Sequence, residues 1–216
     1  MIPSAPLTLR NTFLRFNISD SCMGLACAIV LLLPENVNNR CIALSDMLFR
    51  AHHGDTHLNA VSCIPHLTLA MGCVEDSYCD LLFERLTQLS RSCKPVSIVV
   101  DGVKIENNVS SFSVKRSDEL LSLHKDVISV VSDLFSYDAD PTMFYQEPPC
   151  TTLSRYWTND YPRTKTLDAY DPHITLGQGV LSSLDSFTFH ANHIAVCHLG
   201  IKSTCRKILF STSLHP

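Results

Sequence analysis

One octapeptide pattern occurs twice in this chain, at residues 65–72 and 172–179. Both copies read Pro-His-x-Thr-Leu-x-x-Gly, with an aliphatic residue at the first variable position. Their histidines, His66 and His173, are separated by about half of the 216-residue chain. Repetition at this spacing predicts a duplicated half-domain, in which each half presents one imidazole and one hydroxyl to a common cleft.

The residue types in the repeat indicate chemistry on a phosphodiester. Side chains alternate sides along a strand, so His66 and Thr68 point the same way, as do His173 and Thr175. Histidine can take or give a proton near neutral pH, and hydroxyls can hold the phosphate oxygens where charge builds in the transition state. We therefore expect the two histidines to act as general acid and base, the two threonines to bind the phosphate, and no metal or cofactor to be needed. A near-symmetric pair does not tell which histidine is the base.

These two motifs resemble the signature of the 2H phosphoesterase superfamily. That group contains bacterial 2′,5′-RNA ligase-like proteins, cyclic nucleotide phosphodiesterases and viral 2′,5′-phosphodiesterases, and its pattern is two His-x-Thr/Ser motifs with hydrophobic flanks. Residues 64–69 and 171–176 both fit, except that Asp171 occupies a flank that is often apolar. Outside the motifs the chain has no strong match to one subfamily, so the resemblance implies a mechanism and leaves the substrate open.

The resemblance implies an enzyme whose substrates have a ribose 2′-oxygen in the scissile ester. Such substrates are 2′,5′-linked oligoadenylates, 2′,5′-containing cyclic dinucleotides and 2′,3′-cyclic phosphates. Viral members of the superfamily use the reaction to destroy nucleotide alarm signals, so degradation of an immune signal is one implied role. Two alternatives are an RNA-end processing enzyme with the same chemistry and a nucleotide- or RNA-binding module without turnover. The intact motifs in both halves disfavour the second alternative.

Composition narrows the class of partner and the organisation of the chain. The formal net charge of −4 disfavours a protein that grips long nucleic acid by its phosphates, so we expect a small nucleotide or short oligonucleotide and no obligatory protein partner. Length and a 45% hydrophobic content predict one cytoplasmic globular domain over residues 1–216, with approximate halves 20–95 and 96–216. The ten cysteines have no zinc-ligand spacing, which favours reduced thiols.

An apolar run at residues 23–33 follows Arg10 and Arg15 and imitates a signal peptide or membrane anchor. The run is too short to span a bilayer and ends at Pro34-Glu35 without a convincing cleavage site. We expect a buried strand there and no contact with a membrane.

Hydrophobic periodicity elsewhere indicates helices and strands in mixed order with short connections, which predicts an α+β fold. We expect two pseudo-symmetric lobes of antiparallel sheet flanked by helices, with the active cleft between them. Strands at 96–103 and 109–115 should form a hairpin that turns at residues 106–108. The other expected strands are 22–33, 62–71, 186–199 and 206–212, and the expected helices are 39–51, 76–92 and 118–135.

Residues 136–172 contain five prolines and no long periodic element, so we expect an irregular loop. The segment also holds five of the six tyrosines and the only tryptophan, with cations among them. Aromatic rings beside cations suit base stacking and phosphate contact, although packing of the loop onto the domain is the alternative. The expected substrate-binding residues are Tyr145, Trp157, Tyr161 and Arg155.

The remaining histidines carry weaker signals. The stretch His-His-Gly-Asp-Thr-His at residues 52–57 contains possible metal ligands but lacks a convincing framework, which favours a solvated loop. His190, His193 and His198 fall on one expected strand, where His190 and His198 share a face and His193 lies on the other. Surface or structural use is the expectation for all three.

Overall fold

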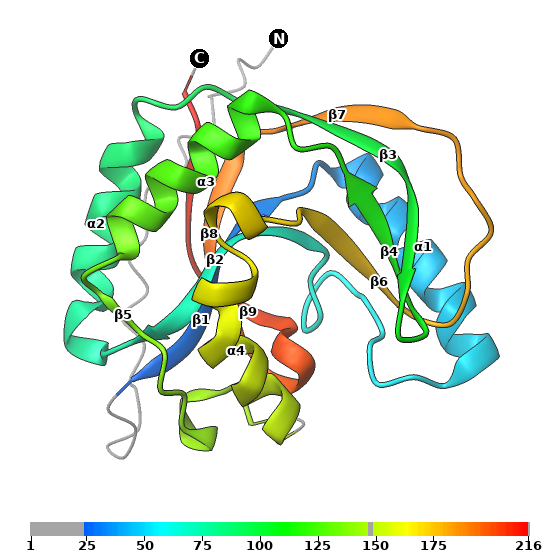
Figure 1. Ribbon diagram of the computed structural model, residues 1–216, viewed down its shortest axis with the longest axis horizontal. Coiled ribbons are helices and arrows are strands. Elements are labelled where there is room, and N and C mark those ends of the chain that lie inside the picture. Colours follow the sequence, from blue (N-terminus) through cyan, green and yellow to red (C-terminus); the bar gives the residue numbers. More distant parts are fainter. Residues whose placement is uncertain (1–23, 147–148, 216) are drawn as a thin grey trace, which may run out of the picture.

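The computed structural model describes residues 24–146 and 149–215. Within this part of the chain, strands form two antiparallel sheets covered by helices (Figure 1), which confirms the α+β plan with two lobes. The first sheet has the strand order β5-β2-β1-β8-β9 and the second has the order β6-β4-β3-β7. The strands are β1 (Leu25–Leu32), β2 (His66–Val74), β3 (Val96–Glu106), β4 (Val109–Val114), β5 (Phe135–Ser136), β6 (His173–Gln178), β7 (Phe187–Ala191), β8 (His193–Leu199) and β9 (Cys205–Ser213).

Helices cover the two sheets differently. Helices α2 and α3 pack on each other and on the first sheet, whereas α1 packs on β6 of the second sheet, at the other side of the molecule in Figure 1. Helix α4 packs on β2, so the first sheet has helices on both faces. The helices are α1 (Glu35–His52), α2 (Cys79–Ser90), α3 (Asp118–Val131) and α4 (Thr152–Thr164), and short 3-10 turns are η1 (Asp76–Tyr78), η2 (Pro141–Met143), η3 (Leu167–Ala169) and η4 (Ile201–Ser203).

The motif strands show the expected alternation. Leu67 and Leu69 in β2, and Ile174 and Leu176 in β6, are fully buried in one hydrophobic core that joins both sheets to α1, α2 and α3. The histidine and threonine of each motif are half-buried on the opposite face. A strand whose alternate residues are strongly apolar is fixed in register, because a slip of one residue would expose that core face. The core therefore determines which way the four polar motif residues point.

The hairpin between β3 and β4 turns as expected. Asn107 and Asn108 both have positive φ, near 50° and 61°, which is the backbone of a two-residue hairpin turn. Asparagine tolerates this left-handed conformation better than most residues. The hairpin places the tip of the second sheet beside β6, which pairs with β4.

The expectation of an irregular loop over residues 136–172 is wrong, because helix α4 lies within it. Thr151 caps the helix by accepting a hydrogen bond from the backbone N–H of Ser154. The buried face consists of Ser154, Thr158 and Tyr161, and small hydroxyl residues do not produce a hydrophobic period. The Thr158 hydroxyl donates to the Ser154 carbonyl within the helix, so burial leaves it satisfied.

The expected strand at 186–199 is also wrong, since two strands in different sheets replace it. β7 pairs with β3 in the second sheet, and after Asn192 the chain continues as β8, which pairs with β1 and β9 in the first. His190 and His198 therefore lie in different sheets, so the expectation that they share a face of one strand does not apply. The C-terminal strands complete the first sheet, so the two sheets do not follow the two halves of the sequence.

The N-terminal apolar run forms the buried strand β1, at the centre of the first sheet. Arg10, Arg15 and Cys22 lie outside the described residues. Among the helices that the structure describes, none has the length and apolar content to cross a membrane. The nine cysteines in the described ranges are all free thiols.

Candidate active site

The two motif strands meet where the two sheets approach each other. β2 and β6 are in contact, and the motif side chains face a cleft of about 740 Å³ between the lobes. His66, Thr68, His173 and Thr175 all line this cleft. The structure therefore brings together the four residues singled out by the repeat, although they come from opposite halves of the sequence.

Both histidines are held in the same way. The Nδ1 atom of His66 lies 2.7 Å from the carbonyl oxygen of Ile64, and Nδ1 of His173 lies 2.8 Å from the carbonyl oxygen of Asp171. A carbonyl oxygen only accepts, so Nδ1 carries the proton in each neutral ring and Nε2 has the lone pair. The backbone before each motif thus fixes the tautomer and leaves Nε2 for proton exchange in the cleft.

Each motif strand also carries a bulge directly after its threonine. In β2 the register with β1 shifts after Thr68, so that Leu69 is an extra residue. In β6 the register with β4 shifts after Thr175, and Leu176 is the extra residue. A bulge bends a strand and re-aims the side chains beside it, and bulges are common next to active sites. The duplication therefore extends from the sequence pattern to the backbone.

Burial lowers the pKa of both catalytic candidates. For His66 burial is the main cause, and the nearby ring of His173 lowers the pKa further. For His173 burial again dominates, the Asp171 carboxylate raises the pKa, and Lys165 and Lys104 lower it. Both rings therefore tend to be neutral in the free protein. An anionic phosphate in the cleft would favour protonation of one of them.

The backbone carbonyl groups at the bulge in β2 accept hydrogen bonds from two side chains. The Tyr170 hydroxyl donates to the carbonyl of Thr68 over 2.9 Å, and His124 Nδ1 donates to the carbonyl of Leu69 over 2.7 Å. The His124 and Tyr170 rings stack with centroids 3.9 Å apart, and His124 Nε2 accepts the backbone N–H of Leu167. His124 is neutral, because its Nε2 accepts a hydrogen bond and burial lowers the pKa of the ring. This network ties the first motif strand to the segment that leads into the second motif.

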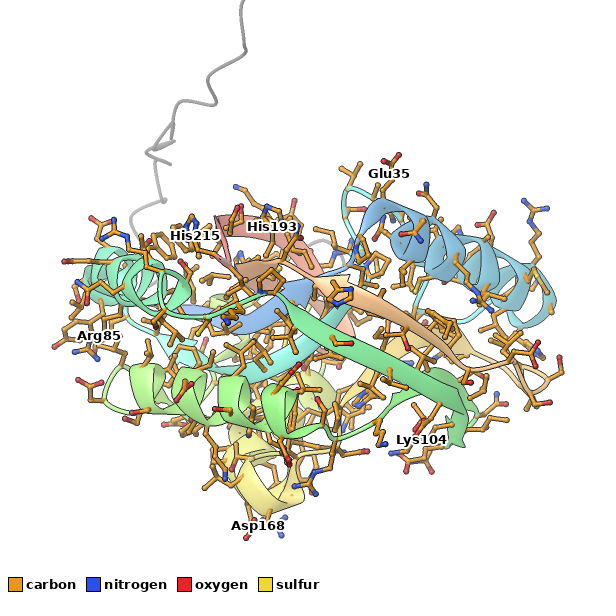
Figure 2. The ribbon with its side chains drawn as sticks, turned by 90° about the horizontal axis from the view of Figure 1, so that it is seen from above. Glu35, Arg85, Lys104, Asp168, His193 and His215 are labelled. Carbon is orange, nitrogen blue, oxygen red and sulfur yellow. The ribbon has the colours of Figure 1, made fainter. Side chains whose placement is uncertain are left out.

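Charged side chains line the cleft beside the second motif. Lys104 forms ion pairs with Asp171 and, at 3.0 Å, with Glu106. Lys165 approaches the same Asp171 carboxylate at 3.2 Å. Figure 2 shows Lys104 on β3, on the side of the molecule where Asp168 also lies. Asp171, the centre of this group of four charged side chains, is the counterpart of the apolar Ile64 in the first motif.

Helix α4 forms another wall of the cleft, with side chains three and four residues apart. Trp157 and Tyr161, two of the expected substrate-binding residues, lie on this wall. Trp157 is 40% exposed, whereas Tyr161 is buried against the first sheet. Tyr156, which was not among the expected contacts, also lines the cleft and is 56% exposed.

The other two expected substrate-binding residues lie elsewhere. Tyr145 donates its backbone N–H to Leu199, and its ring meets the edge of His198. The Arg155 guanidinium donates to the carbonyl of Ala139. Neither residue is among those that line the cleft, so the structure does not bring them together with the motif residues. Arg155 lies outside the cleft because it is two residues before Trp157, and the helical repeat places the two side chains on different faces of α4.

The histidine-rich stretch at residues 52–57 has other partners. His57 is hydrogen-bonded to the Asp46 carboxylate and stacks on Phe49 with centroids 4.1 Å apart. Asp55 pairs with Lys202 at 2.7 Å. In the described ranges, no group of three His, Cys, Asp or Glu side chains is arranged to hold a metal ion.

Several cleft residues were not found from the sequence. Each lies on a strand, turn or helix whose direction into the cleft depends on which strands pair, and this was not known from the pattern. They include Lys104, Asn107, Ser111 and Gln178, whereas Tyr156 and Lys165 belong to the aromatic and cationic segment 136–172 that the sequence indicated as a whole.

Comparisons with known proteins agree with this arrangement. The model of the 2'-5' RNA ligase superfamily matches residues 40–188, more than half of the chain, including both motifs. TT0787 of Thermus thermophilus superposes with a TM-score of 0.56 at 14% identity, covering 88% of this chain and 98% of that one. Escherichia coli LigT complexed with 3'-AMP gives a TM-score of 0.57 at 13% identity, covering 89% and 99% of the two chains. These likenesses show the fold. The comparison with curated proteins gives no match.

Proposed function

The chain belongs to the 2'-5' RNA ligase superfamily, and from this premise we propose that it is a metal-independent phosphodiesterase. Its proposed substrate is a small nucleotide with a ribose 2′-linked phosphodiester: a 2′,5′-oligoadenylate, a 2′,5′-containing cyclic dinucleotide or a 2′,3′-cyclic phosphate. The observation that carries the proposal is the matched pair His66 and His173, each with Nδ1 bonded to backbone and each beside a threonine, in one cleft. Degradation of a nucleotide immune signal is one role for such an activity.

The proposed reaction needs one neutral and one protonated histidine. The neutral ring takes a proton at Nε2 from the attacking water or hydroxyl, whose oxygen forms a new bond to phosphorus. The protonated ring gives its proton to the departing ribose oxygen as the old bond from phosphorus breaks. The hydroxyls of Thr68 and Thr175 donate to the non-bridging oxygens, where negative charge increases. The two rings end with exchanged protonation states, and exchange with water restores them.

A base contact on α4 completes the proposed complex. Trp157 presents a half-exposed ring to the cleft, and an indole face can stack on any nucleobase. Tyr161 contributes the buried part of the same wall. This arrangement supports a substrate that is a nucleotide in preference to a simple phosphate ester.

The proposal is tested by a panel of 2′,5′-linked, 3′,5′-linked and 2′,3′-cyclic nucleotides, incubated with the protein in EDTA and analysed for products. We expect cleavage of 2′-linked esters, turnover lowered by orders of magnitude in a His173→Ala control, and no effect of the chelator. Activity that EDTA removes and Mn²⁺ or Zn²⁺ restores would contradict the metal-independent scheme. Nucleotide binding without turnover would favour a binding module, and turnover confined to RNA ends would favour RNA-end processing.

A further inference from the structure

A row of donor groups leads away from the catalytic centre across the second sheet. Ser111 on β4 lies opposite Thr175 on β6, and Lys104 on β3 lies opposite Ser111. Residues directly opposite each other on neighbouring strands share a face, and all three side chains line the cleft. With strands about 4.8 Å apart, the backbone of Lys104 lies roughly 10 Å from that of Thr175. The donors therefore extend beyond the site of one phosphate.

Ser111 provides the middle of this row. It is only 7% exposed, and its hydroxyl has no hydrogen bond to another residue that the structure describes. The adjacent Ser110, which points to the other face, donates its hydroxyl to the carbonyl of Gly179 over 2.7 Å. The Ser111 side chain lines the cleft, so its hydroxyl can donate to a group that enters there.

The two lysines keep N–H donors for an anion. An ammonium group has three donors, and Lys104 directs one to Asp171 and one to Glu106, whereas Lys165 directs one to Asp171. One donor of Lys104 and two of Lys165 therefore remain. The shared Asp171 carboxylate holds the two ammonium groups close to each other, on the cleft wall that Ser111 also lines.

The first sheet has no matching row. Opposite Thr68 on the neighbouring strand lies Val30, which is fully buried beneath α4. Along the paired strands, polar extension from the catalytic centre therefore occurs on the second sheet. The aromatic wall is α4 on the first sheet, where Lys202, Ser203 and Thr204 also line the cleft. A substrate with a base on α4 would direct its remaining phosphate groups toward Ser111 and Lys104.

We propose that Ser111, Lys104 and Lys165 form a second phosphate subsite beside the scissile one. This inference rests on the proposed function and narrows its substrate class to nucleotides with at least two phosphate groups. The class includes 2′,5′-linked oligonucleotides with a terminal phosphate and 2′,5′-containing cyclic dinucleotides, and it excludes 2′,3′-cyclic mononucleotides as the preferred substrate. The cleft volume of about 740 Å³ is in the upper part of the range for small-molecule sites, which suits more than one nucleotide.

The test compares a 2′,5′-linked dinucleotide with and without a 5′-phosphate, together with a 2′,5′-containing cyclic dinucleotide. For the wild type, we expect the added phosphate to raise kcat/KM by about tenfold or more, because charge-assisted hydrogen bonds to it are made. In Lys104→Gln and Ser111→Ala this ratio should fall toward one. Lys125→Gln, at an exposed position on α3 outside the cleft, is the matched control and should keep the ratio.

Binding is measured in parallel by the fluorescence of Trp157, the only tryptophan of the chain, which lines the cleft. A tighter Kd for the phosphorylated dinucleotide, lost in Lys104→Gln, supports the subsite even if none of the compounds is cleaved and the proposed function fails. Cleavage with equal kcat/KM and equal Kd for all substrates would overturn the subsite and leave the proposed function standing. A Lys104 effect confined to the cyclic dinucleotide would identify an internal phosphodiester as the second group. If Lys104→Gln lowers the melting temperature, the kcat/KM ratio and the Kd values of Ser111→Ala decide between these outcomes.

Discussion

The two motif strands carry the same pair of proposed catalytic residues, a histidine and a threonine, and their surroundings differ. In each, Nδ1 of the histidine bonds to the carbonyl two residues earlier, and a bulge follows the threonine. The first strand lies beneath α4 in an apolar environment, whereas the second lies beside four charged side chains. The proposed catalytic groups are therefore duplicated, while their surroundings differ between the two motif strands. Substitutions on each side of the cleft test this difference.

The largest expected effect comes from the duplicated part. His66→Ala and His173→Ala should each lower kcat by about 10²- to 10⁴-fold, because each removes a proton-transfer group. Melting temperature and substrate binding should change little, since both rings are only half-buried. Steady-state kinetics on a cleaved 2′-linked substrate provide the measurement. Near-wild-type turnover by either variant would show that the two halves are not equivalent in the reaction.

The next effect concerns the wall of the cleft that α4 forms on the first sheet. Trp157→Ala should lower kcat/KM by roughly 5- to 150-fold and weaken base preference, because base stacking on an aromatic ring is lost. Tyr145→Ala is the matched control, since that ring lies outside the cleft lining and should leave base preference intact. The measurement is kcat/KM for adenine-, guanine- and uracil-containing substrates, with melting temperatures for both variants. Loss in proportion to stability alone would show that Trp157 is structural.

The difference between local patterns and long-range pairing explains what the sequence could predict. Strand alternation is a local property, so the pattern around His66 and His173 was enough to predict which side chains share a face. Helix α4 was missed because its buried face is made of Ser154 and Thr158, whose hydroxyls replace the usual apolar period. The change of sheet at Asn192 was missed because both segments are strands and only their partners differ.

The charged wall of the cleft required knowledge of pairing between distant segments. Whether Ser111 and Lys104 face the catalytic centre depends on β6 pairing with β4 and on β4 pairing with β3. Nothing in the spacing of these residues carries that information. The sequence already showed that Asp171 stands where the family pattern is often apolar. Its ion pairs with Lys104 and Lys165 account for a charged residue at this position.

A smaller effect tests the network that joins the halves. Tyr170→Phe keeps the ring stacked on His124 and removes the hydroxyl that bonds to the Thr68 carbonyl. Since a buried acceptor loses its partner, the free energy of unfolding should fall by about 1–3 kcal/mol. Because Thr68 also loses an anchor, kcat should fall by about threefold to tenfold with little change in KM.

Tyr137→Phe is the control for this variant. Its hydroxyl has no hydrogen bond within the described ranges, and its ring packs partly buried against the core. Thermal melting and separate values of kcat and KM are the measurements. A Tyr170→Phe protein with reduced stability and unchanged kcat would limit the network to folding.

The smallest expected effect concerns the electrostatic difference between the two histidines. Asp171 raises the pKa of His173, and the matching position in the first motif holds the uncharged Ile64. In Asp171→Asn the carboxylate is lost and the charges of Lys104 and Lys165 are less compensated, so both changes lower the pKa of His173. The decrease should be less than about one unit, because the lysines already offset much of the carboxylate in the wild type.

Titration of the histidine ring protons by NMR measures this change at each site. The pKa of His173 should decrease, whereas that of His66 should move less, because burial is the main influence on it. The pH profile of kcat/KM should be bell-shaped, and the limb controlled by His173 should move to lower pH by the same amount. An increase in the His173 pKa, or equal shifts of both rings, would contradict the assignment of Asp171 to one half of the site. The limb that moves would also show whether His173 acts as the base or as the acid of the reaction.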